Sequence, residues 1–195
     1  VAGSARRRRT GGRSMSDEGR NRRSTPSNGR PRGARGATDG RRGGQQGPVR
    51  TVQPARRVAY DVLRAVSETD AYANLVLPPA IAEARLTPQD AALATELTYG
   101  TLRRLGTYDA IIAAAADRSP DSIDPAVLDA LRLAVHQLLA TRVASHAAVN
   151  ESVNLVATES GRGASSFAHA VLRRITRESA EAWQTRIDQP ARPAP

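Results

Sequence analysis

Paired arginines are the residues of this sequence whose type and spacing best suit a definite chemistry, which is the binding of phosphate. Outside the N-terminal segment, three pairs occur, at Arg56-Arg57, Arg103-Arg104 and Arg173-Arg174. A guanidinium presents its donors in a rigid fork that matches the oxygens of a phosphate group. If the fold brought these pairs together, they would form a patch for a nucleic-acid backbone. The alternative is that each pair caps a helix end or forms ion pairs with nearby acids.

The other side chains that could do chemistry lack the neighbours that catalysis requires. The chain has no cysteine, so it offers neither a thiolate nucleophile nor a thiolate metal ligand. His136, His146 and His169 do not follow a metal-ligand spacing, and we expect packing or surface roles for them. No strand precedes Ser165-Ser166, which we interpret as a helix cap, and we expect Asn150-Glu151 to form ordinary hydrogen bonds. We therefore expect no catalytic residue and no metal site.

The first fifty residues differ in composition from the rest of the chain. They hold fourteen arginines and three acidic residues, whereas residues 51–195 hold fifteen arginines and sixteen acidic residues. They contain no aromatic residue and only three large apolar ones, too few to offset the entropy of ordering. We expect residues 1–51 to form a disordered Arg/Gly-rich tail. Its Arg-Gly steps between Arg32 and Gly44 are typical of arms that bind nucleic acid, and the alternatives are a solubilising tail or a true start at Met15.

Apolar periodicity predicts that residues 52–188 form helices with no strand. From Leu93 to Leu105, apolar or small side chains recur at steps of three and four, which predicts one long buried helix as the packing centre. Pro54, Thr87-Pro88 and Asp124-Pro125 predict the starts of three helices. The last helix holds Trp183, which either packs this helix down or faces a further domain.

Glycines and prolines predict where the helices are interrupted. We expect Pro78-Pro79 to interrupt or delay a helix, because proline cannot donate a backbone hydrogen bond. Gly161–Gly163 should end a helix, and Gly106 should allow a kink. Gly100 lies inside the predicted central helix, where we expect it to permit close packing.

These predictions add up to an all-α fold of about seven helices with short connections. The domain should span residues 52–188, and the proline-rich segment 189–195 should be a linker or an artificial end of the chain. No run of eighteen apolar residues occurs, so we expect no membrane association. The absence of cysteine fits a protein of the cytoplasm.

Several segments resemble the NusB-type helical domain and occur in that family's order. Two of them, Ala71–Asn74 and His146–Val153, are most similar to the N-terminal domain of 16S rRNA cytosine-5 methyltransferases of the RsmB (Fmu/Sun) family. His136 and His169 depart from the family pattern, which usually has an aromatic residue and an asparagine there. The full set of similar segments is Arg56–Ala59, Ala71–Leu75, Glu96–Arg104, Leu131–Leu133, Gln137–Leu139, His146–Val153, Phe167 and Val171–Arg174.

The resemblance implies a helical bundle of two halves that binds or positions RNA. In that enzyme family a downstream Rossmann-like domain binds S-adenosylmethionine and supplies two catalytic cysteines. This chain has no cysteine and no glycine-rich loop after a strand, so we expect a non-catalytic domain that carries no cofactor itself. Its expected partners are 16S rRNA and its own C-terminal catalytic domain, and a monomer is favoured. We expect RNA contacts at Arg50, Arg56, Arg57, Arg103, Arg104, Arg173 and Arg174.

Two other functions remain open at this point. The first is a free-standing antitermination factor of the NusB type, which would bind a boxA-like RNA together with a ribosomal protein. The second is a protein-interaction module whose basic tail is incidental.

Overall fold

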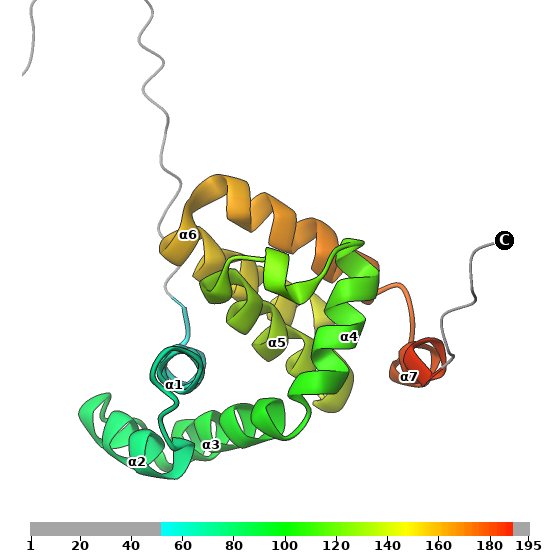
Figure 1. The fold of residues 1–195 in the computed structure, drawn as a ribbon. Coiled ribbons are helices and arrows are strands. Elements are labelled where there is room, and N and C mark those ends of the chain that lie inside the picture. The colour runs from blue at the N-terminus through cyan, green and yellow to red at the C-terminus, as the bar shows by residue number, and fades with distance from the viewer. Residues whose placement is uncertain (1–51, 189–195) are drawn as a thin grey trace, which may run out of the picture. The chain divides into compact units, whose positions relative to one another are not determined.

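The computed structural model describes residues 52–188, and this part of the chain is built from helices (Figure 1). The all-α prediction is therefore confirmed for the described residues. The expected tail and the expected C-terminal linker, residues 1–51 and 189–195, lie outside them, as does Arg50. The helices are α1 (Pro54–Thr69), α2 (Ala73–Glu83), α3 (Pro88–Arg103), α4 (Leu105–Ala116), α5 (Pro125–Ala140), α6 (Ser145–Ile175) and α7 (Ala180–Asp188), with a short 3₁₀ helix, η1 (Pro120–Ser122), before α5.

The predicted helix starts are confirmed, and their side chains show why. The Thr87 hydroxyl oxygen accepts a hydrogen bond from the Asp90 backbone N–H at 3.1 Å, which satisfies one free donor of α3. One carboxylate oxygen of Asp124 accepts from the N–H groups of Ala126 and Val127 at 2.9 and 3.2 Å. Proline follows both cap residues and also opens α1, where its missing N–H costs nothing.

The helices form two halves that share a core. Helices α1, α2 and α3 pack on one another, and α4 and α6 pack on α5. Helices α1 and α3 also pack against α5, so the larger core cluster extends across both halves. This cluster includes Tyr60 and Leu63 from α1, Leu97 from α3 and Leu131 from α5. α5 lies among the other helices (Figure 1), and apolar burial around it holds the domain together.

The predicted long central helix is wrong at its C-terminal end. It ends at Arg103, and α4 begins at Leu105 in a new direction (Figure 1). Arg104 between them has φ −123° and ψ 22°, which is outside the helical range. The break therefore lies two residues before Gly106, the expected kink. It allows Tyr108, Ile111 and Ile112 of α4 to be buried in the core.

Gly100 permits close packing, as expected. It is buried against the imidazole of His136 on α5, which is only 2% exposed. A Cβ atom at this position would lie 2.3 Å from both Cε1 and Nε2 of that ring. Nδ1 of the same ring is hydrogen-bonded to the Tyr108 hydroxyl at 2.9 Å, so the ring has little freedom to withdraw.

We expect Gly100→Ala to destabilise the domain by about 1–2 kcal/mol. Overpacking a close contact costs about 1–3 kcal/mol, and the higher helix propensity of alanine offsets up to about 1 kcal/mol. Urea denaturation followed by circular dichroism measures the change. Gly106→Ala is the matched control, because nothing lies within 4 Å of a Cβ atom there. Equal stability of the two variants would show that His136 does not restrict this position.

Pro78 and Pro79 lie inside α2 without interrupting it, contrary to the expectation. Both side chains are exposed, and only Leu77 of this helix is buried. The carbonyl groups left without their usual donors belong to Asn74 and Leu75, which are themselves exposed. Water satisfies such groups, so the two prolines cost less here than inside a buried helix.

α6 folds back on itself at Gly161. This residue has φ 82° and ψ −176°, a conformation that only glycine adopts readily. The helix break expected at Gly161–Gly163 is therefore confirmed. The second arm resumes earlier than expected, and the hydroxyl groups of Ser165 and Ser166 donate to the Arg162 carbonyl from positions within the helix. These serines are not caps.

A buried ionic network joins α1, α4 and α5. Asp129 on α5 is 1% exposed, and its carboxylate accepts hydrogen bonds from Arg64 at 2.8 Å, Ser67 at 3.1 Å and Arg132 at 2.9 Å. Arg132 also donates to both carboxylate oxygens of Asp109 on α4, at 2.7 and 2.8 Å. A single carboxylate therefore holds one side chain from its own helix and two from α1.

Trp183 packs the last helix down, which settles the two alternatives left by the sequence. Its ring is fully buried in the larger core cluster, and its indole N–H donates to the Ile175 carbonyl at 3.0 Å. The Arg186 guanidinium lies 4.8 Å from the ring centroid. α7 is thereby attached to the end of α6 and to α4, on which it packs.

Candidate nucleic-acid interface

Arg56 on α1 is partly buried, and neutral groups hold its guanidinium. Its Nε donates to the Gln137 side-chain oxygen on α5 at 2.6 Å, and an Nη donates to the Gln53 side chain. Gln137 in turn donates to the Leu133 carbonyl at 3.2 Å. No carboxylate among residues 52–188 forms an ion pair with Arg56, so its charge remains available at the start of α1.

The positive charge of the neighbouring Arg57 is balanced by two carboxylates. Its Nε lies 2.9 Å from a carboxylate oxygen of Asp61, and one of its Nη atoms is bonded to Glu159 on α6. Its guanidinium also lies 5.7 Å from the Tyr60 ring centroid. Burial, with Glu159 nearby, raises the pKa of Tyr60 to about 12. Arg57 thus connects α1 to α6, and a phosphate would have to compete with two carboxylates for it.

Arg103 and Arg104 are both exposed at the junction of α3 and α4. Neither forms an ion pair with any residue of the described domain. Burial lowers the pKa of His136, Glu96 opposes this shift, and the positive charges of Arg104 and Arg103 add to it. His136 is therefore neutral at pH 7, and its Nε2, 3.4 Å from a Glu96 oxygen, forms no ion pair there.

The structure separates two of the arginine pairs, Arg103-Arg104 and Arg173-Arg174. Arg104 directly precedes α4, whereas Arg174 donates to the carbonyl of Ala115, near the end of α4, at 3.1 Å. Eleven residues at 1.5 Å each separate these two positions by about 16 Å along α4. Any RNA that contacted both pairs would have to extend along the length of α4.

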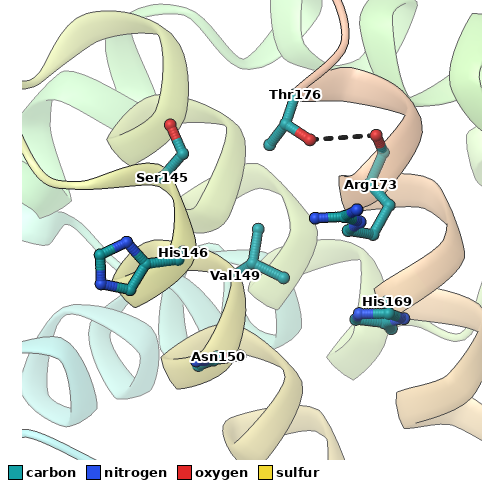
Figure 2. A pocket seen from close by; sticks show the side chains of 7 residues that line it. All are labelled: Ser145, His146, Val149, Asn150, His169, Arg173 and Thr176. Atoms are coloured by element: carbon teal, nitrogen blue, oxygen red, sulfur yellow. Dashed lines mark hydrogen bonds between the residues drawn. The ribbon is translucent and has the colours of Figure 1, made fainter.

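Arg173 lies in a cleft between the two arms of α6, which we call the α6 cleft. The cleft has a volume of about 360 Å³. Figure 2 shows His146 on one side, Arg173 and His169 on the other, and Val149 between them. Because Gly161 reverses the helix, residues far apart in sequence meet here. The residues that line it are Ser145, His146, Val149, Asn150, His169, Arg173 and Thr176.

The side chains of the α6 cleft are positive or neutral. No aspartate or glutamate is among its lining residues, and Arg173 is exposed without an ion pair to any described residue. Glu151, adjacent to the cleft in sequence, instead accepts from the Gln53 backbone N–H of the other half at 3.1 Å. The Thr176 hydroxyl donates to the backbone carbonyl of Arg173 at 3.0 Å, so this bond does not involve the guanidinium (Figure 2). This donor set suits an anion.

Arg173 was predicted from the sequence to contact RNA, whereas His146, Asn150 and His169 were expected to have separate packing or surface roles. A signal for their grouping was present, since His146 and Asn150 are four residues apart, as are His169 and Arg173. Each pair shares one helix face. What the sequence did not show is that the two faces meet, because that depends on the direction in which Gly161 turns the chain.

A second cleft, of about 390 Å³, lies between α1 and α2. Arg57, Asp61 and Glu83 are among its lining residues. With two carboxylates beside one arginine, it suits phosphate less well than the α6 cleft. Within residues 52–188, no group of three or more potential metal ligands converges, and no helix is both long and apolar enough to cross a membrane.

Comparison with known proteins identifies the family to which this fold belongs. The family model described as the NusB family matches residues 53–177, which is more than half of the chain. The chain belongs to the NusB family. Among solved structures, the NusB-type fold is found in the complex of antitermination factors NusB and NusE with double-stranded RNA. A chain of that complex matches with a TM-score of 0.59 and 22% identity, over 64% of this chain and 94% of that one.

Longer relatives carry a similar NusB domain. A Mycobacterium tuberculosis protein with a provisional methyltransferase name is 52% identical over 134 residues, which are 69% of this chain and 29% of that protein. A Bacillus subtilis protein provisionally named ribosomal RNA small subunit methyltransferase B is 31% identical over 138 residues, covering 70% of this chain and 30% of that protein. The chain thus spans less than a third of the length of these relatives.

Proposed function

We propose that this NusB domain binds RNA as the non-catalytic N-terminal part of an S-adenosylmethionine-dependent 16S rRNA cytosine-5 methyltransferase. Two relatives are named as methyltransferases, and one of these names specifies ribosomal RNA. These names support a methyltransferase as the parent protein. The main observation in support of RNA binding is that most arginines of the three pairs form no ion pair within the described residues. Of the six arginines from the three pairs, only Arg57 forms an ion pair within residues 52–188.

In this proposal, methyl transfer takes place in a further domain, which corresponds to the part of the relatives that this chain does not match. S-adenosylmethionine would supply the methyl group there. The described residues do not fit that cofactor, because they form no strand followed by a glycine-rich loop. The chain's own contribution is to hold rRNA, with the catalytic domain and 16S rRNA as partners in the cytoplasm.

One observation favours a second candidate, a free-standing antitermination factor. The matched segment corresponds to 94% of the NusB chain in the NusB–NusE complex, so the domain is equivalent to a whole protein of that kind. A gene that continues past Pro195 into a cysteine-containing Rossmann-like segment excludes this candidate. A stop codon soon after Pro195 favours it.

Exchanging Arg103 and Arg104 for glutamine should weaken RNA binding and reduce its salt dependence. Each phosphate contact releases counterions, so the double variant should lower the slope of log Kd against log salt by about two. Fluorescence anisotropy with a 16S rRNA hairpin and an unrelated hairpin, at several salt concentrations, measures both effects. The titrations are run with the full chain and with residues 52–195.

Arg162→Gln is the matched control for charge, since Arg162 is exposed at the turn of α6 and forms no ion pair with a described residue. Because it removes one charge rather than two, it should change the slope by less than half as much as the double variant. If hairpin binding disappears when residues 1–51 are removed, the tail rather than the NusB domain binds RNA. In that case the domain is better explained as a docking platform for the catalytic domain.

A further inference from the structure

The α6 cleft is an open cleft that is large enough to hold a small molecule. Its volume of about 360 Å³ lies at the lower end of the range for ligand pockets, about 300–1,000 Å³. A phosphate group alone would fill only part of this volume. The cleft therefore has room for a larger group attached to an anion.

The floor and sides of the cleft suit a flat ring. Val149 is 5% exposed and provides an apolar floor between the two arms (Figure 2). His146 and His169 lie on opposite sides of it, and both are exposed. Histidine rings and arginine planes are surfaces on which unstacked RNA bases pack. The Asn150 amide can both donate to and accept from a base edge.

The charge of the cleft suits a phosphate beside that ring. Arg173 offers a guanidinium with no carboxylate partner in the described domain, and no acidic side chain lines the cleft. The first turn of α6 faces the same space with Ser145 and His146, and its cap residue Ala144 has no side-chain acceptor for the free N–H groups. These groups add to the attraction for an anion but do not define the site without Arg173.

We propose that the α6 cleft binds one unpaired nucleotide, with its phosphate on Arg173 and its base on Val149 between His146 and His169. The inference rests on the proposed RNA-binding function only for the source of the nucleotide, which is either an RNA strand or a free mononucleotide. An unpaired residue of rRNA would then be held by the domain while its paired neighbours remain outside the cleft.

Titration with cytidine 5′-monophosphate, followed by NMR, tests the site itself. The methyl signals of Val149 and the side-chain signals of Arg173 and both histidines should shift together in the full chain. Cytidine and inorganic phosphate, each alone, should bind more weakly than the nucleotide. Arg173→Gln should weaken binding of the nucleotide about tenfold, the loss expected for a charge-assisted hydrogen bond to phosphate.

The control variant is Arg162→Gln, which removes the same charge from the same helix. Eleven residues separate it from Arg173, about 16 Å along the second arm, so it should leave nucleotide affinity unchanged. Equal loss in both variants would overturn the proposal, because it would indicate general electrostatic attraction. Equal affinity for inorganic phosphate and the nucleotide would also overturn it, because the base would then contribute nothing.

A second arm of the experiment separates this inference from the proposed function. The 16S rRNA hairpin is titrated with and without saturating cytidine monophosphate, and competition supports RNA as the source. If the hairpin binds but the nucleotide shifts none of the cleft signals, the cleft proposal fails and the RNA-binding function stands. If the nucleotide binds and no RNA does, the site is supported for free nucleotides and the proposed function fails.

Discussion

Replacing Asp129 by alanine should lower the free energy of unfolding by about 3–5 kcal/mol, the cost of removing one member of a buried ion pair. The carboxylate is 1% exposed and accepts from Arg64, Ser67 and Arg132. Without it, two guanidinium groups, each only 16% exposed, lose their buried partner. Because a domain of this size is stable by about 5–15 kcal/mol, the loss should be a large fraction of the total.

Urea denaturation at pH 7, monitored by circular dichroism, measures the effect. Glu68→Ala is the matched control, since it removes another carboxylate partner of Arg64 whose own side chain is 58% exposed. An exposed ion pair contributes at most about 1 kcal/mol, so this variant should remain close to the parent. If Asp129→Ala cost no more than the control, the network would not contribute to joining α1 to α5.

Trp183→Ala should cost about 3–5 kcal/mol, the range for truncating a fully buried aromatic side chain. The change leaves a cavity in the larger core cluster, and it removes the hydrogen bond from the indole N–H to the Ile175 carbonyl. α7 has only nine residues, too few for a stable helix in isolation. We therefore expect α7 to separate from α4 and α6 in this variant.

Trp183→Phe separates the two contributions to this effect. Phenylalanine keeps most of the apolar surface and lacks the N–H donor, so a smaller loss of about 1–2 kcal/mol is expected. Thermal unfolding compares the three proteins, and hydrogen exchange reports on α7 directly. Full protection of α7 in Trp183→Ala would contradict the view that this one side chain attaches the helix.

Local chemistry determined which parts of the fold could be predicted from the sequence. Thr87 and Asp124 were recognisable as caps because a cap is a contact within four residues. The sequence predicted a kink at Gly106, two residues after the actual break at Arg104, because the apolar steps continue from Leu97 through Leu105 as they would in one helix. Tertiary packing of α4 on α5 and α6 fixes the residue at which the chain turns.

The candidate site was less predictable than the fold, for a related reason. The sequence shows the positions of the arginines but not which acidic residues form ion pairs with them. Arg57 meets Glu159 from α6, a partner 102 residues away, whereas Arg173 meets none among the described residues. Whether an arginine is available to a ligand therefore depends on long-range pairing, which spacing along one helix does not reveal.

The backbone conformation of Gly161 has a further consequence for how many chains make up one folded unit. Straightened, the 31 residues of α6 would be about 46 Å long, more than the diameter of a small domain. The second arm, with Val171, Leu172 and Ile175, would then leave its own core and could be buried again only in another copy of the chain. A side chain at position 161 would favour that exchange of arms between molecules. Glycine at this position thus keeps the C-terminal arm within its own chain.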